Sequence, residues 1–186
     1  MRELTAEHLT SYLQTRQPDW RDIEIRDLHR LPMGASRETF RFDLAYADAD
    51  GPQSLKVILR RDPPASNVDS DRRHEYEAYR AIHGHGVPVP RMLLLEEDPE
   101  PVGGAISLAE DLRGFHNSEY QFQDPAWADR LPFVAREMWT AMGRLAAVDV
   151  ARLDLSFTRP ATVETTARQE LDYWVKSLRD HDVGPE

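Results

Sequence analysis

The chain contains no cysteine. This absence excludes disulfide frameworks and thiolate chemistry, and a reducing compartment fits it by default. Long apolar runs are also missing, because no stretch approaches the roughly 20 residues that a membrane-spanning helix needs. The N-terminus, Met1 to Leu4, opens into a helical pattern and lacks the apolar core of a signal peptide. We therefore expect a cytoplasmic protein with no membrane partner.

Positive charge is in short supply, since 23 Lys and Arg face 33 Asp and Glu and the net charge is −10. Non-specific binding of nucleic acid or anionic membranes needs a cationic surface, so neither is expected. From Glu96 to Asp129 nine acidic residues accompany one arginine. Such a run is usually a solvated face, and the alternative is a rim that attracts a cationic substrate. The seven histidines show no metal-ligand spacing, so no metal site is predicted.

Apolar periodicity in the first 110 residues predicts a helix, three strands, a second helix and two strands. Thr5 is placed to cap the first helix and Pro18 to end it. The strand from Thr39 to Ala47 alternates apolar and polar residues, and Asp48 to Gly51 reads as a hairpin turn. The predicted strands cover 23–31, 39–47, 54–61, 91–95 and 104–110, and the second helix covers 71–83. Short antiparallel strands with helices predict an α+β lobe.

Beyond Gly114 the pattern is helical. Asp124 and Pro125 are typical of a helix start, Pro132 is expected to interrupt that helix, and a longer one is expected to continue to about residue 149. A last helix is predicted over 160–178. Apolar stripes follow the two longer helices at spacings of three and four, which favours packing over ligand contact. The stripes consist of Met138, Met142 and Leu145, and of Ala167, Leu171, Trp174 and Leu178.

Three features follow one another in the first half of the chain. A small-residue loop, Gly34-Ala35-Ser36, lies between the first two predicted strands, where backbone N–H groups could close over a phosphate. Arg60 stands near the end of the third strand and Glu75 on the next helix. Each feature alone is ordinary. Loop, strand-borne cation and helix-borne carboxylate in this order are typical of the nucleotide lobe of a kinase.

Six segments, in order, resemble the aminoglycoside phosphotransferase and choline-kinase-like family. The most similar branch is that of the phosphotransferase domains attached to some acyl-CoA dehydrogenases. The segments lie at 34–40, 57–64, 74–82, 86–91, 109–114 and 145–149. The resemblance implies a protein-kinase-like N-terminal lobe over residues 1–108, a hinge over 109–114 and the start of a helical C-terminal lobe over 115–186.

The resemblance also implies roles for nine residues. The backbone of Gly34, Ala35, Ser36 and Arg37 would cover the phosphates of ATP. Arg60 matches the strand lysine that contacts these phosphates, and Glu75 matches the helix carboxylate that orients it. Ile58 would touch the adenine, and the segment from Glu110 to Leu112 would bind the edge of the base.

Two of these assignments have alternatives on the same elements. Lys56 shares a strand face with Arg60 by the two-residue period of a strand, so it could contact the phosphates instead. Glu77 could replace Glu75. Either exchange would leave the architecture unchanged.

No catalytic or metal-binding residue is assigned, because the family's His-Gly-Asp motif, the Asn after it and the later Asp that binds Mg²⁺ have no match. The only His-Asp pair, His181-Asp182, has no downstream Asn. We therefore expect this chain to be the first part of a longer kinase and to be inactive alone. ATP is the expected cofactor, with Mg²⁺ in the full-length parent.

Two functions remain open at this stage. The first is the ATP-binding part of a phosphotransferase that moves the γ-phosphate to a hydroxyl of an unidentified small molecule. The second is a non-catalytic kinase-like binding module that oligomerises. The stripe of Leu171, Trp174 and Leu178 bears on this choice, because a natural short protein would have to cover it by self-association through the C-terminal helix.

Overall fold

The computed structural model describes residues 3–32, 37–62, 72–113, 125–159 and 162–180. By contacts the chain divides into two compact units, Met1–Leu155 and Ser156–Glu186. Each unit is described by itself. The predicted segments at 33–36, 63–71 and 181–186, which include the small-residue loop and the His181-Asp182 pair, lie outside the described residues.

Within the described residues of the first unit, five strands form one antiparallel sheet. The strands are β1 (Arg21–Arg30), β2 (Glu38–Asp48), β3 (Gly51–Arg61), β4 (Met92–Glu96) and β5 (Ile106–Glu110), in the order β1-β2-β3-β5-β4. The hairpin between β2 and β3 is the predicted one, with Asp48 opposite Gly51 and φ of +105° at Gly51. Glycine suits this turn because the left-handed region is open to it without steric cost.

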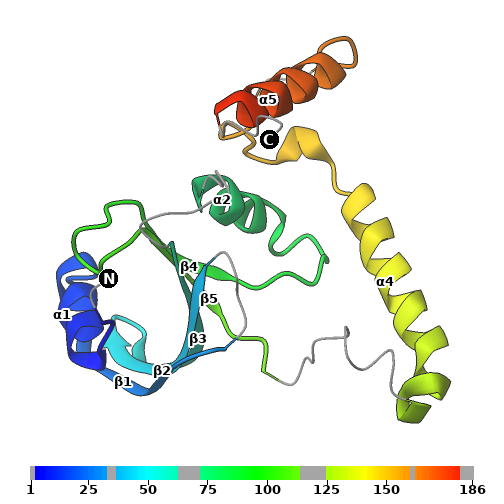
Figure 1. Cartoon of the computed structure of the whole chain (residues 1–186). Helices are drawn as coiled ribbons and strands as arrows, with labels where there is room; N and C mark the ends of the chain where they lie inside the picture. Colours follow the sequence, from blue (N-terminus) through cyan, green and yellow to red (C-terminus); the bar gives the residue numbers. More distant parts are fainter. Residues whose placement is uncertain (1–2, 33–36, 63–71, 114–124, 160–161, 181–186) are drawn as a thin grey trace. The chain divides into compact units, whose positions relative to one another are not determined.

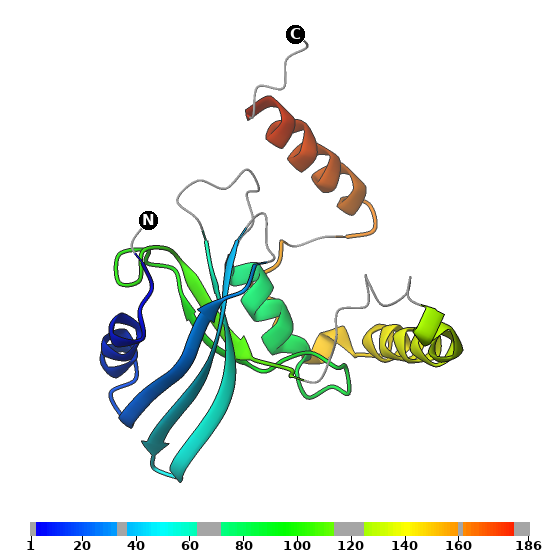
Figure 2. The same cartoon turned by 60° about the horizontal axis from the view of Figure 1, so that its bottom comes forward.

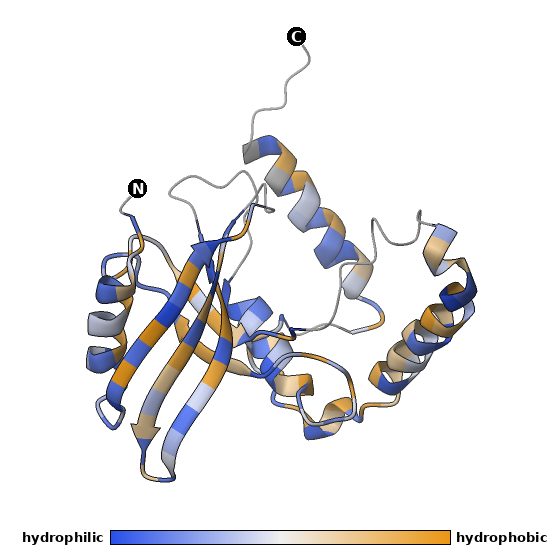
Figure 3. Cartoon of the chain, turned by 90° about the horizontal axis from the view of Figure 1, so that it is seen from below, coloured by the Kyte–Doolittle hydropathy of each residue, from blue (hydrophilic) through white to orange (hydrophobic). Residues whose placement is uncertain are grey.

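The hydrophobic core lies between one face of the sheet and α1 (Ala6–Arg16). Thr5 caps α1 as predicted, because its side chain accepts a hydrogen bond from the N–H of His8 at 3.2 Å. Residues along β2 alternate in hydropathy, as Figure 3 shows, and in both β2 and β3 more buried positions alternate with less buried ones, so that each strand buries one row of side chains. The core consists of Leu4, Leu9, Tyr12, Leu13, Ile23, Phe40, Phe42, Leu44, Val57, Leu59, Leu94, Val102, Ile106 and Leu108.

The second helix, α2 (Arg72–Ile82), covers the opposite face of the sheet, against β4 and β5 (Figures 1 and 2). Gly84 and Gly86 follow its end with φ of +85° and +77°, which confirms the predicted glycine stop. The extent of burial predicted for the stripe on α2 is too high. Tyr76 and Tyr79 are only half-buried, and Arg72 is the buried residue of this helix.

The edge strand β1 is irregular. Its pairing with β2 shifts register between Arg21 and Glu24 and again between Arg26 and His29. Asp22 and Asp27, inside these two shifts, have φ of 53° and 56°. Aspartate is among the few non-glycine residues that enter the left-handed region with ease, so both positions are chemically suited to a bulge.

Helices follow the sheet in the chain, as predicted. A 3-10 turn, η1 (Pro125–Arg130), leads into α4 (Leu131–Ala146), and a second 3-10 turn, η2 (Val150–Arg152), comes after it. Pro132 was expected to interrupt a helix but lies in the first turn of α4, where its missing N–H has no partner to lose. In the second unit α5 (Thr166–Asp180) begins six residues later than the predicted start at 160.

The predicted apolar stripes of α4 and α5 are exposed in the structure. Met138, Met142 and Leu145 of α4 are 55%, 56% and 47% exposed. Leu171, Trp174 and Leu178 of α5 are 53%, 56% and 60% exposed. Neither stripe is therefore covered by the described residues of its own unit, which agrees with the expectation that the stripe of Leu171, Trp174 and Leu178 needs a partner to cover it.

Candidate functional site

A pocket of about 150 Å³ lies on the α2 side of the sheet, at the end of β5. Five of the residues predicted from the sequence line it together: Ile58, Arg60, Glu75, Glu110 and Leu112. The remaining lining residues, which sequence reasoning did not assign to a site, are Tyr79, Pro90, Met92, Ser107 and Ala109.

Strand register explains why these residues meet. Ile58 pairs with Ala109 and Arg60 with Ser107 across β3 and β5, so all four side chains share the sheet face that carries α2. The neighbouring residues Val57 and Leu59 point to the core on the other face and are fully buried. The two-residue period of β5 could have identified Ser107 and Ala109 from the sequence.

The expected ion pair between Arg60 and Glu75 is present. Nη1 of Arg60 bonds to Oε1 of Glu75, with the side chains 39% and 22% exposed. Lys56, the alternative cation, instead bonds to Asp43 at 3.1 Å. Glu77, the alternative carboxylate, pairs with Arg80 one turn along α2 at 2.8 Å. The geometry therefore favours Arg60 and Glu75 as the pair at this pocket.

Glu75 also bonds to a second guanidinium, that of Arg37. Oε2 of Glu75 accepts from Nη1 of Arg37, whose Nε lies 3.0 Å from Oδ1 of Asp62. Asp62 in turn pairs with Arg72, the first residue of α2. Sequence reasoning assigned Arg37 only a backbone role in the loop and did not find Asp62 or Arg72. No local pattern signals these pairs, because they join Arg37, which precedes β2, to Asp62 at the end of β3 and to residues of α2.

The segment from Glu110 to Arg113 is fastened to the sheet by its backbone and by one buried acid. The N–H of Glu110 donates to the carbonyl of Arg91 at 2.9 Å, and that of Asp111 to the carbonyl of Lys56 at 2.8 Å. The Asp111 side chain, 5% exposed, lies 2.8 Å from Nε of Arg41 and 2.6 Å from Nε of Arg113. Asp111 therefore fixes the chain between Glu110 and Leu112, which line the pocket.

Asp43 on β2 belongs to the same group of ion pairs as Asp111 and Arg113. Lys56 and Arg113 both bond to Asp43, and they hold the pKa of its carboxyl below the usual range. Asp43 is thus ionised at neutral pH and links β2 to Arg113.

The described residues bear on a metal site and on a membrane span. In this part of the chain, no three His, Asp or Glu side chains gather as the ligands of a metal ion would. None of its helices combines the length and the apolar character that crossing a bilayer requires.

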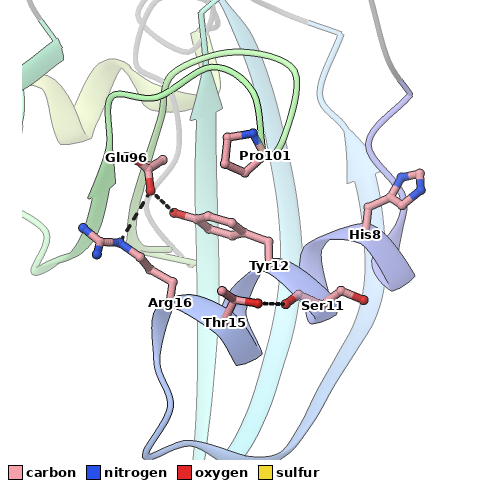
Figure 4. A pocket seen from close by; sticks show the side chains of 7 residues that line it. All are labelled: His8, Ser11, Tyr12, Thr15, Arg16, Glu96 and Pro101. Carbon is pink, nitrogen blue, oxygen red and sulfur yellow. Dashed lines mark hydrogen bonds and ion pairs between the residues drawn. The ribbon is translucent and has the colours of Figure 1, made fainter.

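A larger hollow of about 390 Å³ lies beside α1, away from the predicted site residues (Figure 4). Tyr12 and Arg16 both point toward Glu96 of β4, at 3.1 Å and 3.5 Å from its Oε2. Burial, and next the charge of Glu96, raise the pKa of the Tyr12 hydroxyl. These contacts tie α1 to β4, and we interpret them as structural.

Comparison with known proteins identifies the family. A model of the phosphotransferase enzyme family matches residues 27–185. The chain belongs to this phosphotransferase family. The resemblance found in the sequence is thereby confirmed.

Two relatives of this member of the phosphotransferase family are informative. A probable acyl-CoA dehydrogenase, IBR3, of Arabidopsis thaliana is 28% identical over 152 residues, which are 77% of this chain and 17% of that protein. The crystal structure of a putative aminoglycoside phosphotransferase from Ralstonia eutropha JMP134 superposes with a TM-score of 0.59 at 18% identity. It covers 98% of this chain and 50% of that one. The predicted α+β, kinase-like fold is confirmed by this likeness.

The chain thus spans half of the solved neighbour and about a sixth of the curated relative. The dehydrogenase name of the Arabidopsis protein fits the branch that the sequence motifs indicated.

Proposed function

We propose that this chain is the ATP-binding part of a small-molecule phosphotransferase, whose whole protein transfers the γ-phosphate of ATP to a substrate hydroxyl. The observation that carries the proposal is the pocket itself. One end holds the Arg60–Glu75 pair and the other end holds the hinge residues Glu110 and Leu112. Family membership supports the reaction class.

Each group has a role that its chemistry suits. Arg60 would bind the phosphates through its planar fork of N–H donors, and Glu75 would hold that guanidinium in place. Ile58 offers an apolar surface to the adenine ring. Glu110 and Leu112, on either side of the anchored Asp111, would hydrogen-bond the base through the backbone. The loop from Gly34 to Ser36 is proposed to cover the phosphates.

Transfer itself needs groups that we do not assign in this chain. Mg²⁺ would neutralise charge on the phosphates, and we assign no residue of this chain to it. We propose that the chain alone binds ATP weakly and transfers no phosphate. Its domain division at 1–108, 109–114 and 115–186 is proposed on the same family pattern.

Binding of ATP and of adenosine by calorimetry tests the proposal. Arg60→Met should weaken ATP binding about tenfold or more, because charged hydrogen bonds contribute ~1.5–3 kcal/mol, while adenosine binding stays unchanged. Lys56→Met is the matched control, since it removes a cation from the same strand face and should leave both affinities unchanged. A wild-type chain that binds neither ligand, or a Lys56 variant that loses ATP alone, would contradict these assignments.

A second candidate function rests on the exposed apolar side chains of α4 and α5. Trp139 is 70% exposed and Trp174 is 56% exposed, which is unusual for large apolar groups in a monomer. A kinase-like binding module would bury them by self-association. Light scattering over a concentration series distinguishes the two candidates. If the chain oligomerises and Trp174→Glu abolishes this, the binding-module function is favoured. If the chain stays monomeric at high concentration, that function is ruled out.

A further inference from the structure

Five charged side chains form a continuous chain of ion pairs beside the pocket. Arg60 pairs with Glu75, Glu75 with Arg37, Arg37 with Asp62, and Asp62 with Arg72. Glu75 gives one carboxylate oxygen to each of its two arginines, Oε1 to Arg60 and Oε2 to Arg37. The carboxylate at the nucleotide site is therefore shared, and half of its pairing comes from outside the pocket.

The exposed end of this ion-pair chain is Arg60. Its side chain is 39% exposed and lines the pocket, whereas the Arg37 side chain is 11% exposed and the Arg72 side chain 3%. Arg72 is fixed further, because its Nη1 donates to the hydroxyl of Ser107 at 3.0 Å. Arg37 is thus held between two carboxylates at the inner end, and Arg60 is the cation that a ligand can reach.

A phosphate group bound to Arg60 changes the balance at Glu75. The anion competes for the donors of Arg60, and it repels the carboxylate of Glu75 at short range. A carboxylate that is only 22% exposed is costly to leave without a cation. Arg37 counters both effects, because its bond to Oε2 of Glu75 does not depend on whether Arg60 still bonds to Oε1.

We infer that Arg37 is a positioning residue of the nucleotide site, which keeps Glu75 neutralised and in place while Arg60 binds phosphate. This inference rests on the proposed function. It gives the side chain of Arg37 a task separate from the backbone contacts proposed for the loop. It also explains how Arg60 can bind a phosphate without leaving Glu75 unpaired.

The test compares ATP with adenosine in Arg37→Met. ATP binding should weaken roughly ten- to hundredfold, the loss expected when one charged hydrogen-bonded partner is removed, and adenosine binding should change less than about twofold. Arg37→Lys keeps the charge and should recover part of the ATP affinity. Arg37→Gln keeps a hydrogen-bond donor but not the charge. It serves as a milder second variant, for which we also expect weaker ATP binding and nearly unchanged adenosine binding.

Two controls separate positioning from folding. Arg80→Met removes an arginine that pairs on the exposed side of α2 and should alter neither affinity. In a Glu75→Gln background, Arg37→Met should cost ATP binding much less than in wild type, because no carboxylate remains to be neutralised. An equal loss in both backgrounds, an equal loss of adenosine and ATP, or no loss at all would overturn the inference. A wild-type chain that binds neither ligand would overturn the proposed function instead, and the inference with it.

Discussion

Replacement of Asp111 by Asn tests the idea that the proposed hinge is held by a buried carboxylate. Asp111 lies within 2.8 Å of Arg41 on β2 and within 2.6 Å of Arg113, and its side chain is 5% exposed. Asparagine has the same shape and keeps one acceptor oxygen, but it carries no charge. The variant therefore removes the electrostatic part of the two pairs without opening a cavity.

The exposure of the partners sets the magnitude. Breaking a fully buried pair costs about 3–5 kcal/mol, and an exposed pair contributes about 0–1 kcal/mol. Here the carboxylate is buried, while the Arg41 and Arg113 side chains are 36% and 32% exposed. We therefore expect Asp111→Asn to lower the free energy of unfolding by about 1.5–3 kcal/mol, between these limits.

Urea unfolding of wild type, Asp111→Asn, Arg41→Met and the double variant measures this cost and its coupling. Glu24→Gln breaks the exposed pair with Arg26 and is the matched control, with no measurable loss expected. Adenosine should bind a few-fold more weakly to Asp111→Asn, because Glu110 and Leu112 flank the freed position. If Asp111→Asn behaves like Glu24→Gln in unfolding, the carboxylate does not hold the hinge and the reasoning fails.

Two further predictions concern α1 and the support of the ion-pair chain. The folded structure raises the pKa of Tyr12, so above pH 10 the hydroxyl loses its proton in the unfolded chain before it does in the folded one. The free energy of unfolding therefore falls as the pH rises. Tyr12→Phe should flatten that fall in urea unfolding experiments between about pH 9 and 12. Gly104→Ala should destabilise the lobe by about 1–3 kcal/mol, because the new Cβ would lie 2.5 Å from the carbonyl oxygen of Asp62 and 2.9 Å from Cγ of Arg61. A Gly104→Ala protein with an unchanged melting temperature would show that the backbone there yields freely.

Much of the lobe was accessible from the sequence because its signals are local. Alternation along β2 fixed which residues face the core, the Asp48 to Gly51 turn fixed the register of the hairpin, and the cap at Thr5 fixed the start of α1. The Arg60–Glu75 pair followed from the order of strand and helix, since the two-residue period put Arg60 on the face opposite Leu59.

The parts that were missed depend on how distant segments meet. The link from Arg37 to Asp62 and Arg72 requires the start of α2 to lie beside the ends of β2 and β3, and no periodicity specifies that. Asp111 looks like any surface acid in the sequence, yet the cross-strand position of Arg41 makes it a buried partner. The burial of the α2 stripe was predicted too high. Helical spacing shows which side of a helix faces inward, whereas the packing of the neighbouring layer decides how far each side chain is buried.

The irregular edge strand β1 has a consequence for how the lobe behaves among its own copies. A regular, uncharged edge strand offers a row of unpaired N–H and C=O groups that another strand can join, which is a common route to aggregation. Here the two register shifts and the left-handed backbone at Asp22 and Asp27 break that row, and charged side chains project from it. Copies of this lobe should therefore resist strand-to-strand joining at β1 even when concentrated, and any partner there has to recognise side chains instead of extending the sheet.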